Sequence, residues 1–169
     1  MLSQTHFAGG LAAGAAVILY THSPCGAVLP VLFIAALTGL VPDIDKKGSL
    51  ANQLLGGVGG TVAAKMTHHR TATHSLLAAV GIYLALLVLH VPYVYLLAAM
   101  AGLLFGHLVL DMLNPHGVPL LWPLPLKVGV PLITTGHIGE TFIVRPACYL
   151  LAGYFMAIYF GFIGNYKIF

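Results

Sequence analysis

Five long apolar stretches follow one another along the chain, separated by shorter polar segments. They cover residues 7–20, 26–41, 75–91, 92–113 and 142–164. A hydrocarbon core needs about 20 helical residues to be crossed, so the first two stretches are short and either include flanking polar residues or lie in a locally thinned bilayer. The pattern predicts an all-α, multi-pass transmembrane helical bundle with about five spans, folded as a single domain over residues 1–169.

Two connecting segments differ from simple loops. Residues 49–67 are of intermediate polarity and contain a glycine-rich run, but no Walker pattern that would bind phosphate. We interpret this segment as a mobile loop or a segment lying on the membrane surface, and whether residues 50–65 are surface-lying, re-entrant or spanning stays open. Residues 115–131 are rich in proline and hold Trp122, which suits an anchor at the membrane interface.

The composition excludes an ordinary water-soluble domain. The chain is 59% hydrophobic and only 7% charged, whereas soluble domains carry about 25% charged residues. The lipid bilayer is therefore the solvent for much of the surface. The net charge is +3, but no basic run is interleaved with aromatic residues, so nucleic acid is not expected as a partner.

The residues that could bind a metal lie at alternating ends of the five stretches. If each stretch crosses the bilayer once, the alternation brings all of them to one membrane face. The set is His6, Asp43, Asp45, His74, His107, Asp111 and Glu140. His22 and His90 fall on the opposite face and are expected to have no part in the site.

The distribution of basic residues orients the bundle. Cytoplasmic loops of membrane proteins carry the excess of lysine and arginine. The face with the metal-binding residues carries Lys46, Lys47, Lys65, Arg70, Lys127 and Arg145, and the other face carries Lys167. We therefore predict a plasma (inner) membrane protein with a cytoplasmic N-terminus and a cytoplasmic site.

His107 and Asp111 form the sharpest local motif. Residues four apart lie on one face of a helix, so the two side chains can bind one metal or each other. An intramembrane carboxylate is costly and rarely lacks a partner. The alternative is a His–Asp hydrogen bond that only locks helix packing.

Asp43 and Asp45 follow Pro42 at the end of the second stretch. On an extended turn, two carboxylates can bind one metal or bridge two. Asp43 is the better ligand, and Asp45 supports it. The alternative is a solvated helix end paired with the two lysines that follow.

Residues 68–75 are dense in polar donors. His68 or His69 and His74 offer imidazoles, and Arg70 offers a planar fork for phosphate oxygens. The alternative is a basic segment touching lipid headgroups. His6, His137 and Glu140 each have an ordinary structural interpretation, and it is their position on the same face that favours a role as ligands. Metalloprotease and serine-hydrolase motifs are absent.

These motifs together resemble a known family. They are His6, residues 42–45, residues 69–75, residues 106–117, Leu121-Trp122-Pro123 and residues 136–140. The chain resembles the inner-membrane-associated, metal-dependent hydrolases described as LexA-binding, the YdjM-like family. The resemblance implies a membrane-embedded metallohydrolase whose substrate is poorly defined.

We expect a metal-dependent hydrolase acting on a phosphoester or pyrophosphate of a membrane lipid. Two or three divalent ions, zinc first and manganese as the alternative, would be bound by His6, Asp43, His68, His69, His107, Asp111, His137 and Glu140. The catalytic residues would be Arg70, His74 and Asp45. A homo-oligomer stays open. The rival hypotheses are a divalent-ion transporter or channel and a non-catalytic scaffold that binds a cytoplasmic partner.

Overall fold

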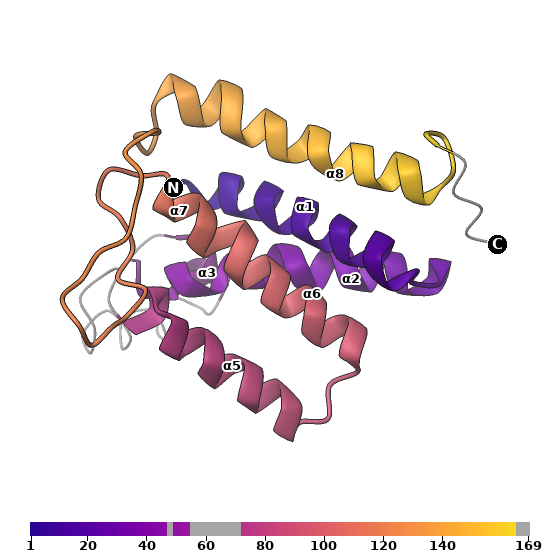
Figure 1. Cartoon of the computed structure of the whole chain (residues 1–169), viewed down its shortest axis with the longest axis horizontal. Coiled ribbons are helices and arrows are strands. Elements are labelled where there is room, and N and C mark those ends of the chain that lie inside the picture. The colour runs from indigo at the N-terminus through magenta and orange to yellow at the C-terminus, as the bar shows by residue number, and fades with distance from the viewer. Residues whose placement is uncertain (47–48, 55–71, 165–169) are drawn as a thin grey trace.

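A computed structural model describes residues 1–46, 49–54 and 72–164 (Figure 1). These residues form helices and turns, and no strand is found among them beyond one isolated bridge between Val118 and Val128. The elements, in chain order, are α1 (Ser3–Thr21), α2 (Cys25–Thr38), the 3₁₀ turn η1 (Val41–Asp45), α3 (Leu50–Leu54), the 3₁₀ turn η2 (Ala72–His74), α5 (Leu76–Val88), α6 (Tyr93–Leu103), the π-helical turn η3 (Leu104–Val109), α7 (Leu110–Met112), the π-helical turn η4 (Glu140–Val144) and α8 (Arg145–Tyr159).

Each predicted apolar stretch corresponds to a helix. The helix Tyr93–Met112, which joins α6, η3 and α7, and the helix Glu140–Tyr159, which joins η4 and α8, are long and apolar enough to cross a membrane. The apolar helices α2 and α5 are shorter. The all-α class is confirmed for the described residues, while the count of five spans stays a prediction.

Helix α1 lies at the centre of the bundle and packs against α2, α6 and α8, whereas α5 packs against α6 at one edge (Figure 1). Glycines permit these close crossings. A Cβ added to Gly10 would lie 2.5 Å from the Ala35 carbonyl oxygen, and one added to Gly106 would lie 2.7 Å from the Gly10 nitrogen. The backbone of α1 therefore passes close to the backbones of α2 and η3 where they cross.

Apolar and polar residues are distributed as lipid requires. Leu29, Val88 and Leu150 are 77%, 76% and 74% exposed, while His6, His107 and Asp111 are 0% exposed. A chain in water would expose such polar groups and bury most of its large apolar side chains. The bundle thus presents many apolar side chains to its surroundings and keeps His6, His107 and Asp111 inside.

The structure corrects two local predictions. Residues 43–45 form the turn η1 and are not extended; Pro42 fixes a backbone angle that suits the start of a helical turn, and the Lys46 amide donates to the Asp43 carbonyl at 3.0 Å. The last helix starts at Glu140, ahead of the predicted residue 142, because the Glu140 amide already donates to the His137 carbonyl at 3.1 Å.

Candidate metal centre

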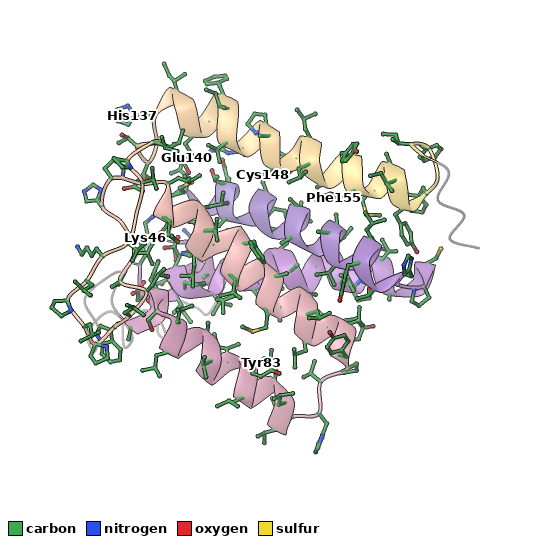
Figure 2. The ribbon with its side chains drawn as sticks, in the orientation of Figure 1. Lys46, Tyr83, His137, Glu140, Cys148 and Phe155 are labelled. Carbon is green, nitrogen blue, oxygen red and sulfur yellow. The ribbon has the colours of Figure 1, made fainter. Side chains whose placement is uncertain are left out.

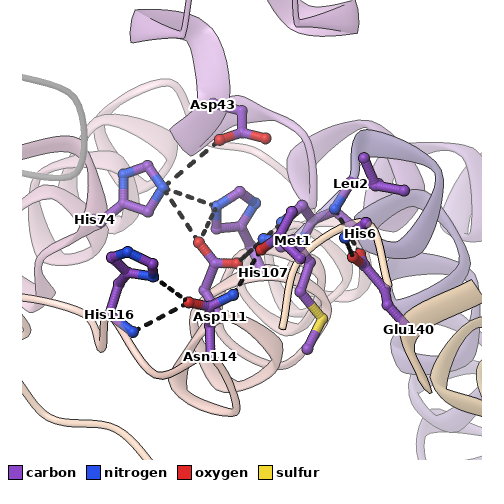
Figure 3. Close-up of polar contacts among 12 residues, drawn as sticks. Met1, Leu2, His6, Asp43, His74, His107, Asp111, Asn114, His116 and Glu140 are labelled. Carbon is purple, nitrogen blue, oxygen red and sulfur yellow. Dashed lines mark hydrogen bonds and ion pairs between the residues drawn. The ribbon is translucent and has the colours of Figure 1, made fainter. Parts of the chain in front are cut away.

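Five buried side chains meet at the end of the bundle that holds the N-terminus (Figure 3). They are His6 of α1, Asp43 of η1, His74 of η2, His107 of η3 and Asp111 of α7. They form two overlapping groups, His6–His107–Asp111 and Asp43–His74–His107, and within each group the candidate ligand atoms lie within 4.8 Å of one another. Segments far apart in the sequence thus supply one cluster.

Two of the imidazoles are oriented by glycine carbonyls. His6 Nδ1 lies 3.1 Å from the Gly106 carbonyl oxygen, and His107 Nδ1 lies 2.7 Å from the Gly39 carbonyl oxygen. A carbonyl only accepts hydrogen bonds, so each Nδ1 carries the proton and donates. Each neutral ring therefore keeps its lone pair on Nε2, the atom that faces the cluster.

The third imidazole is oriented by a side chain. The Thr73 hydroxyl donates to Asp45 Oδ2 at 2.8 Å and lies 2.9 Å from His74 Nδ1. Since its hydrogen is directed at the carboxylate, the hydroxyl oxygen accepts from His74 Nδ1. His74 Nε2 then also carries a lone pair toward the cluster. Outer hydrogen bonds of this kind are typical of histidines that bind metal.

The Nε2 atoms of His74 and His107 lie only 3.0 Å apart. Two lone pairs that face each other at this distance repel, so the pair needs a proton or a metal ion between the rings. Zinc binds imidazole nitrogen at about 2.0–2.1 Å in tetrahedral geometry, which brings neighbouring nitrogens to a similar separation. The pair is therefore suited to share one ion.

Asp111 connects the two groups. Its Oδ1 lies 3.4 Å from His6 Nε2, and its Oδ2 lies 3.7 Å from His74 Nε2 and 3.8 Å from His107 Nε2. The amino group of Met1 also contacts Oδ1. Because each oxygen faces a different set of nitrogens, the Asp111 carboxylate links the two groups of candidate ligands.

Whether the five clustered residues suit a metal ion can be tested at two buried polar atoms. His6 Nε2 and Asp43 Oδ2 have no hydrogen-bond partner among the described residues. An unpaired buried polar atom is costly, and a coordinated ion would satisfy both. Asp43 Oδ1 also lies 3.7 Å from His74 Nε2, so the carboxylate, the form that binds cations, is placed beside an imidazole nitrogen.

Glu140 and His137 do not join either group. Glu140 is buried, and its two oxygens accept from the Leu2 amide at 2.6 Å and the Gly136 amide at 2.7 Å, which ties the start of α1 to the loop before η4. His137 is exposed at the same end of the bundle (Figure 2). The predicted residues His68, His69 and Arg70 lie outside the described residues.

Sequence reasoning missed the groups that orient the ligands. Gly39, Gly106 and Thr73 have no metal-binding side chain, and two of them act through backbone carbonyls. It also missed the π-helical turn η3 that contains His107. Such turns often occur at functional sites. Gly106 next to His107 was the one available signal.

Comparison with known proteins identifies the family of this chain. The family model described as "YdjM inner membrane protein" matches residues 1–167. The chain belongs to this family. The inner membrane protein YdjM of Escherichia coli (strain K12) and its Shigella flexneri counterpart are each 40% identical to it over 104 residues, which cover 59% of this chain and 52% of theirs.

A further relative matches along almost its whole length. The uncharacterized protein YvsG of Bacillus subtilis (strain 168) is 30% identical over 167 residues, 95% of this chain and 98% of YvsG. The chain spans about half the length of the first two relatives. No solved structure gives a significant match. The names of the YdjM relatives support the predicted inner-membrane location, and none of them states an enzymatic activity.

Proposed function

We propose that this protein is a membrane-embedded, metal-dependent hydrolase that cleaves a phosphoester or pyrophosphate bond of a membrane lipid. The observation that carries the proposal is the inward orientation of three imidazole Nε2 atoms beside the carboxylates of Asp43 and Asp111. Every Nδ1 that would compete for a ligand role already donates to an oxygen. A histidine that only paired with an aspartate for helix packing would need one oriented imidazole, whereas three are oriented here.

Two ions fit this donor set. His6 and Asp111 Oδ1 would hold one, and His74, His107 and Asp43 with Asp111 Oδ2 would hold the other. His107 can serve one ion only, since its Nδ1 is bonded to Gly39. Divalent ions at such a site supply an activated water and stabilise charge on the attacking and leaving oxygens. Zinc is the first expectation for this histidine-rich set, with manganese as the alternative.

The remaining predicted residues have separate roles in the proposal. Asp45 and Thr73 hold the His74 ring in position, so Asp45 acts as a positioning residue. Arg70 would bind the phosphate through its guanidinium fork. A site at the membrane face suits a substrate whose hydrocarbon tail stays in lipid, and the cytoplasmic face remains the proposed one.

Transport of divalent ions is less well supported. An ion path needs polar groups at several depths of the membrane. Between Phe7 and Leu19, α1 carries only apolar side chains, and α2 offers none that is charged. The polar cluster therefore has no continuation along the central helices toward the opposite end.

Purified protein in detergent tests the proposal by metal analysis and a phosphate-release screen over lipid phosphates and pyrophosphates. The protein should contain zinc or manganese and release phosphate in a chelator-sensitive manner. His107→Ala and Asp111→Ala should each lose metal and activity, because each removes a ligand and leaves the others buried without a partner. His22→Ala and His90→Ala, at the far end of the bundle, are the matched controls and should keep both. Equal metal content in all four variants, or no turnover by metal-loaded protein, would refute the hydrolase.

A further inference from the structure

An apolar groove of about 600 Å³ runs along α1 between the helix α6–η3 and α8. Its wall on α1 extends from Gly9 to Tyr20, and Ala101 of α6 lies on a second wall. Cys148 and Phe155 of α8 complete the lining on the third side, and Figure 2 labels both. The lining residues that the structure describes carry no charge, so the groove suits an apolar occupant.

The length of the groove matches the hydrocarbon thickness of one bilayer leaflet. From Gly9 to Tyr20, at 1.5 Å per helical residue, it is roughly 16 Å long, which is about half of the 30 Å hydrocarbon core. Its volume of about 600 Å³ falls within the 300–1,000 Å³ that is common for small-molecule sites. A packed α-helix is about 10–12 Å wide and crosses the whole bilayer, so a hydrocarbon chain fits this groove better.

One end of the groove abuts the metal centre. Gly9, at that end, lies one helical turn after His6, and Leu110 in the lining immediately precedes Asp111. A Cβ on Gly9 would lie 2.5 Å from Leu110 Cδ1 and 3.0 Å from the Gly106 carbonyl oxygen, the acceptor for His6. The groove therefore closes where the candidate ligands begin.

A cation lies at the same end. Arg145 comes one turn before Cys148 on α8, and its Nε donates to the Thr5 hydroxyl at 3.5 Å, one turn before Gly9 on α1. The guanidinium has further donors in a planar fork that suits phosphate oxygens. An apolar groove with a guanidinium at its polar end is complementary to an amphiphile with an anionic head.

We infer that the groove binds the hydrocarbon chain of a lipid phosphate, with Arg145 holding the phosphate head at the edge of the metal centre. This inference rests on the proposed function, because it names the substrate as a lipid that enters sideways from the bilayer. It also names a determinant of specificity, because the distance from Gly9 to Tyr20 would limit the length of the hydrocarbon chain that the groove accepts.

Photolabelling of the full chain in detergent tests the groove without turnover. The probe is a long-chain alkyl phosphate with a diazirine near the end of its chain, added to protein that has been treated with a chelator. Labels should map to α1, α6 and α8 around the groove. Unlabelled long-chain alkyl phosphate should compete, whereas butyl phosphate and a long-chain alcohol should compete poorly.

Two filling variants and one charge variant sharpen the test. Ala16→Phe and Ala101→Phe narrow the groove from different walls and should each abolish most of the labelling. Ala85→Phe, on the exposed surface of α5, is the matched control and should label as the unaltered protein does. Arg145→Gln should weaken competition by the alkyl phosphate about tenfold, the loss of one charge-assisted contact.

Labelling spread equally over α5, labelling unchanged in both filling variants, or a label that joins two copies of the chain would overturn the inference. The result is separable from the proposed function. Specific labelling, together with no phosphate release by metal-loaded protein in the separate assay, refutes the hydrolase and leaves the groove as a lipid site. If the filling variants release phosphate equally from substrates with short and with long hydrocarbon chains, the groove is refuted and the hydrolase stands.

Discussion

The Thr73 hydroxyl joins the candidate metal centre to a carboxylate outside it. It donates to Asp45 and lies within hydrogen-bond distance of His74 Nδ1, so it sets which nitrogen of His74 carries the proton. Without this hydroxyl, His74 Nδ1 loses its hydrogen bond to the Thr73 oxygen. Thr73 therefore orients the candidate ligand His74 without binding the metal itself.

Thr73→Val should lower zinc affinity by about 10- to 100-fold, which is typical when the outer partner of a ligand is removed. The substitution keeps the shape of the side chain and removes only the hydroxyl. Competition with a zinc chelator measures the change. Thr73→Ser should stay near the affinity of the unaltered protein, as should Thr21→Val, which removes a hydroxyl at the far end of the bundle. A Thr73→Val protein with unchanged affinity would contradict the role of Thr73 in orienting His74 for metal binding.

For single residues, the sequence predicted which side chains are candidate ligands but not how those side chains are oriented. His6, Asp43, His74, His107 and Asp111 were predicted because residue type and position on one face are visible in the sequence, and the structure brings them together. Their hydrogen-bond partners were not predictable, since a backbone carbonyl belongs to every residue. Glu140 looks like a ligand by type, and only the structure shows that both of its oxygens accept from amides.

Among the helices, one crossing point serves both packing and ligand orientation. Gly10 and Gly106 let α1 and the α6–η3 helix touch, and the Gly106 carbonyl then accepts from His6. The π-helical turn η3 lies at the same place. Helix packing and the position of the His6 ring are consequently coupled.

Gly106→Ala should destabilise the fold by about 1–3 kcal/mol, the usual cost of overpacking, and should lower metal affinity as the carbonyl is displaced. The added Cβ would lie 2.7 Å from the Gly10 nitrogen, where backbone cannot yield easily. Thermal unfolding in detergent measures the loss. Gly81→Ala is the control on α5, where nothing lies within 4 Å, and it should gain about 0.5–1 kcal/mol. A stable Gly106→Ala protein would contradict the close crossing.

Hydropathy predicted the helices well because lipid requires apolar runs, and the ends of the runs lie close to the helix ends. It placed the start of the last helix late, at residue 142, because Glu140 is polar although its backbone is already helical. The turn η3 was not predictable, since a π-helical turn changes the backbone and leaves the hydropathy pattern intact.

For the whole molecule, orientation and span number decide where a substrate can reach the metal centre. The N-terminus (Figure 1) and the side chains of Lys46 and His137 (Figure 2) lie at the end of the bundle that contains the centre. The exposed Cys25 follows the turn after α1, at the opposite end. The positive-inside pattern predicts that the first end is cytoplasmic.

Labelling of intact cells with a membrane-impermeant maleimide tests this topology. In a Cys148→Ala background, Cys25 should react from outside, because its end of the bundle faces away from the cytoplasm. In a background without either native cysteine, Leu89→Cys at the end of α5 should behave as Cys25 does. His137→Cys should react only after the cells are permeabilised. Reaction of His137→Cys from outside would invert the orientation, and opposite behaviour of Cys25 and Leu89→Cys would show that an odd number of crossings separates them and that the five-span count is wrong.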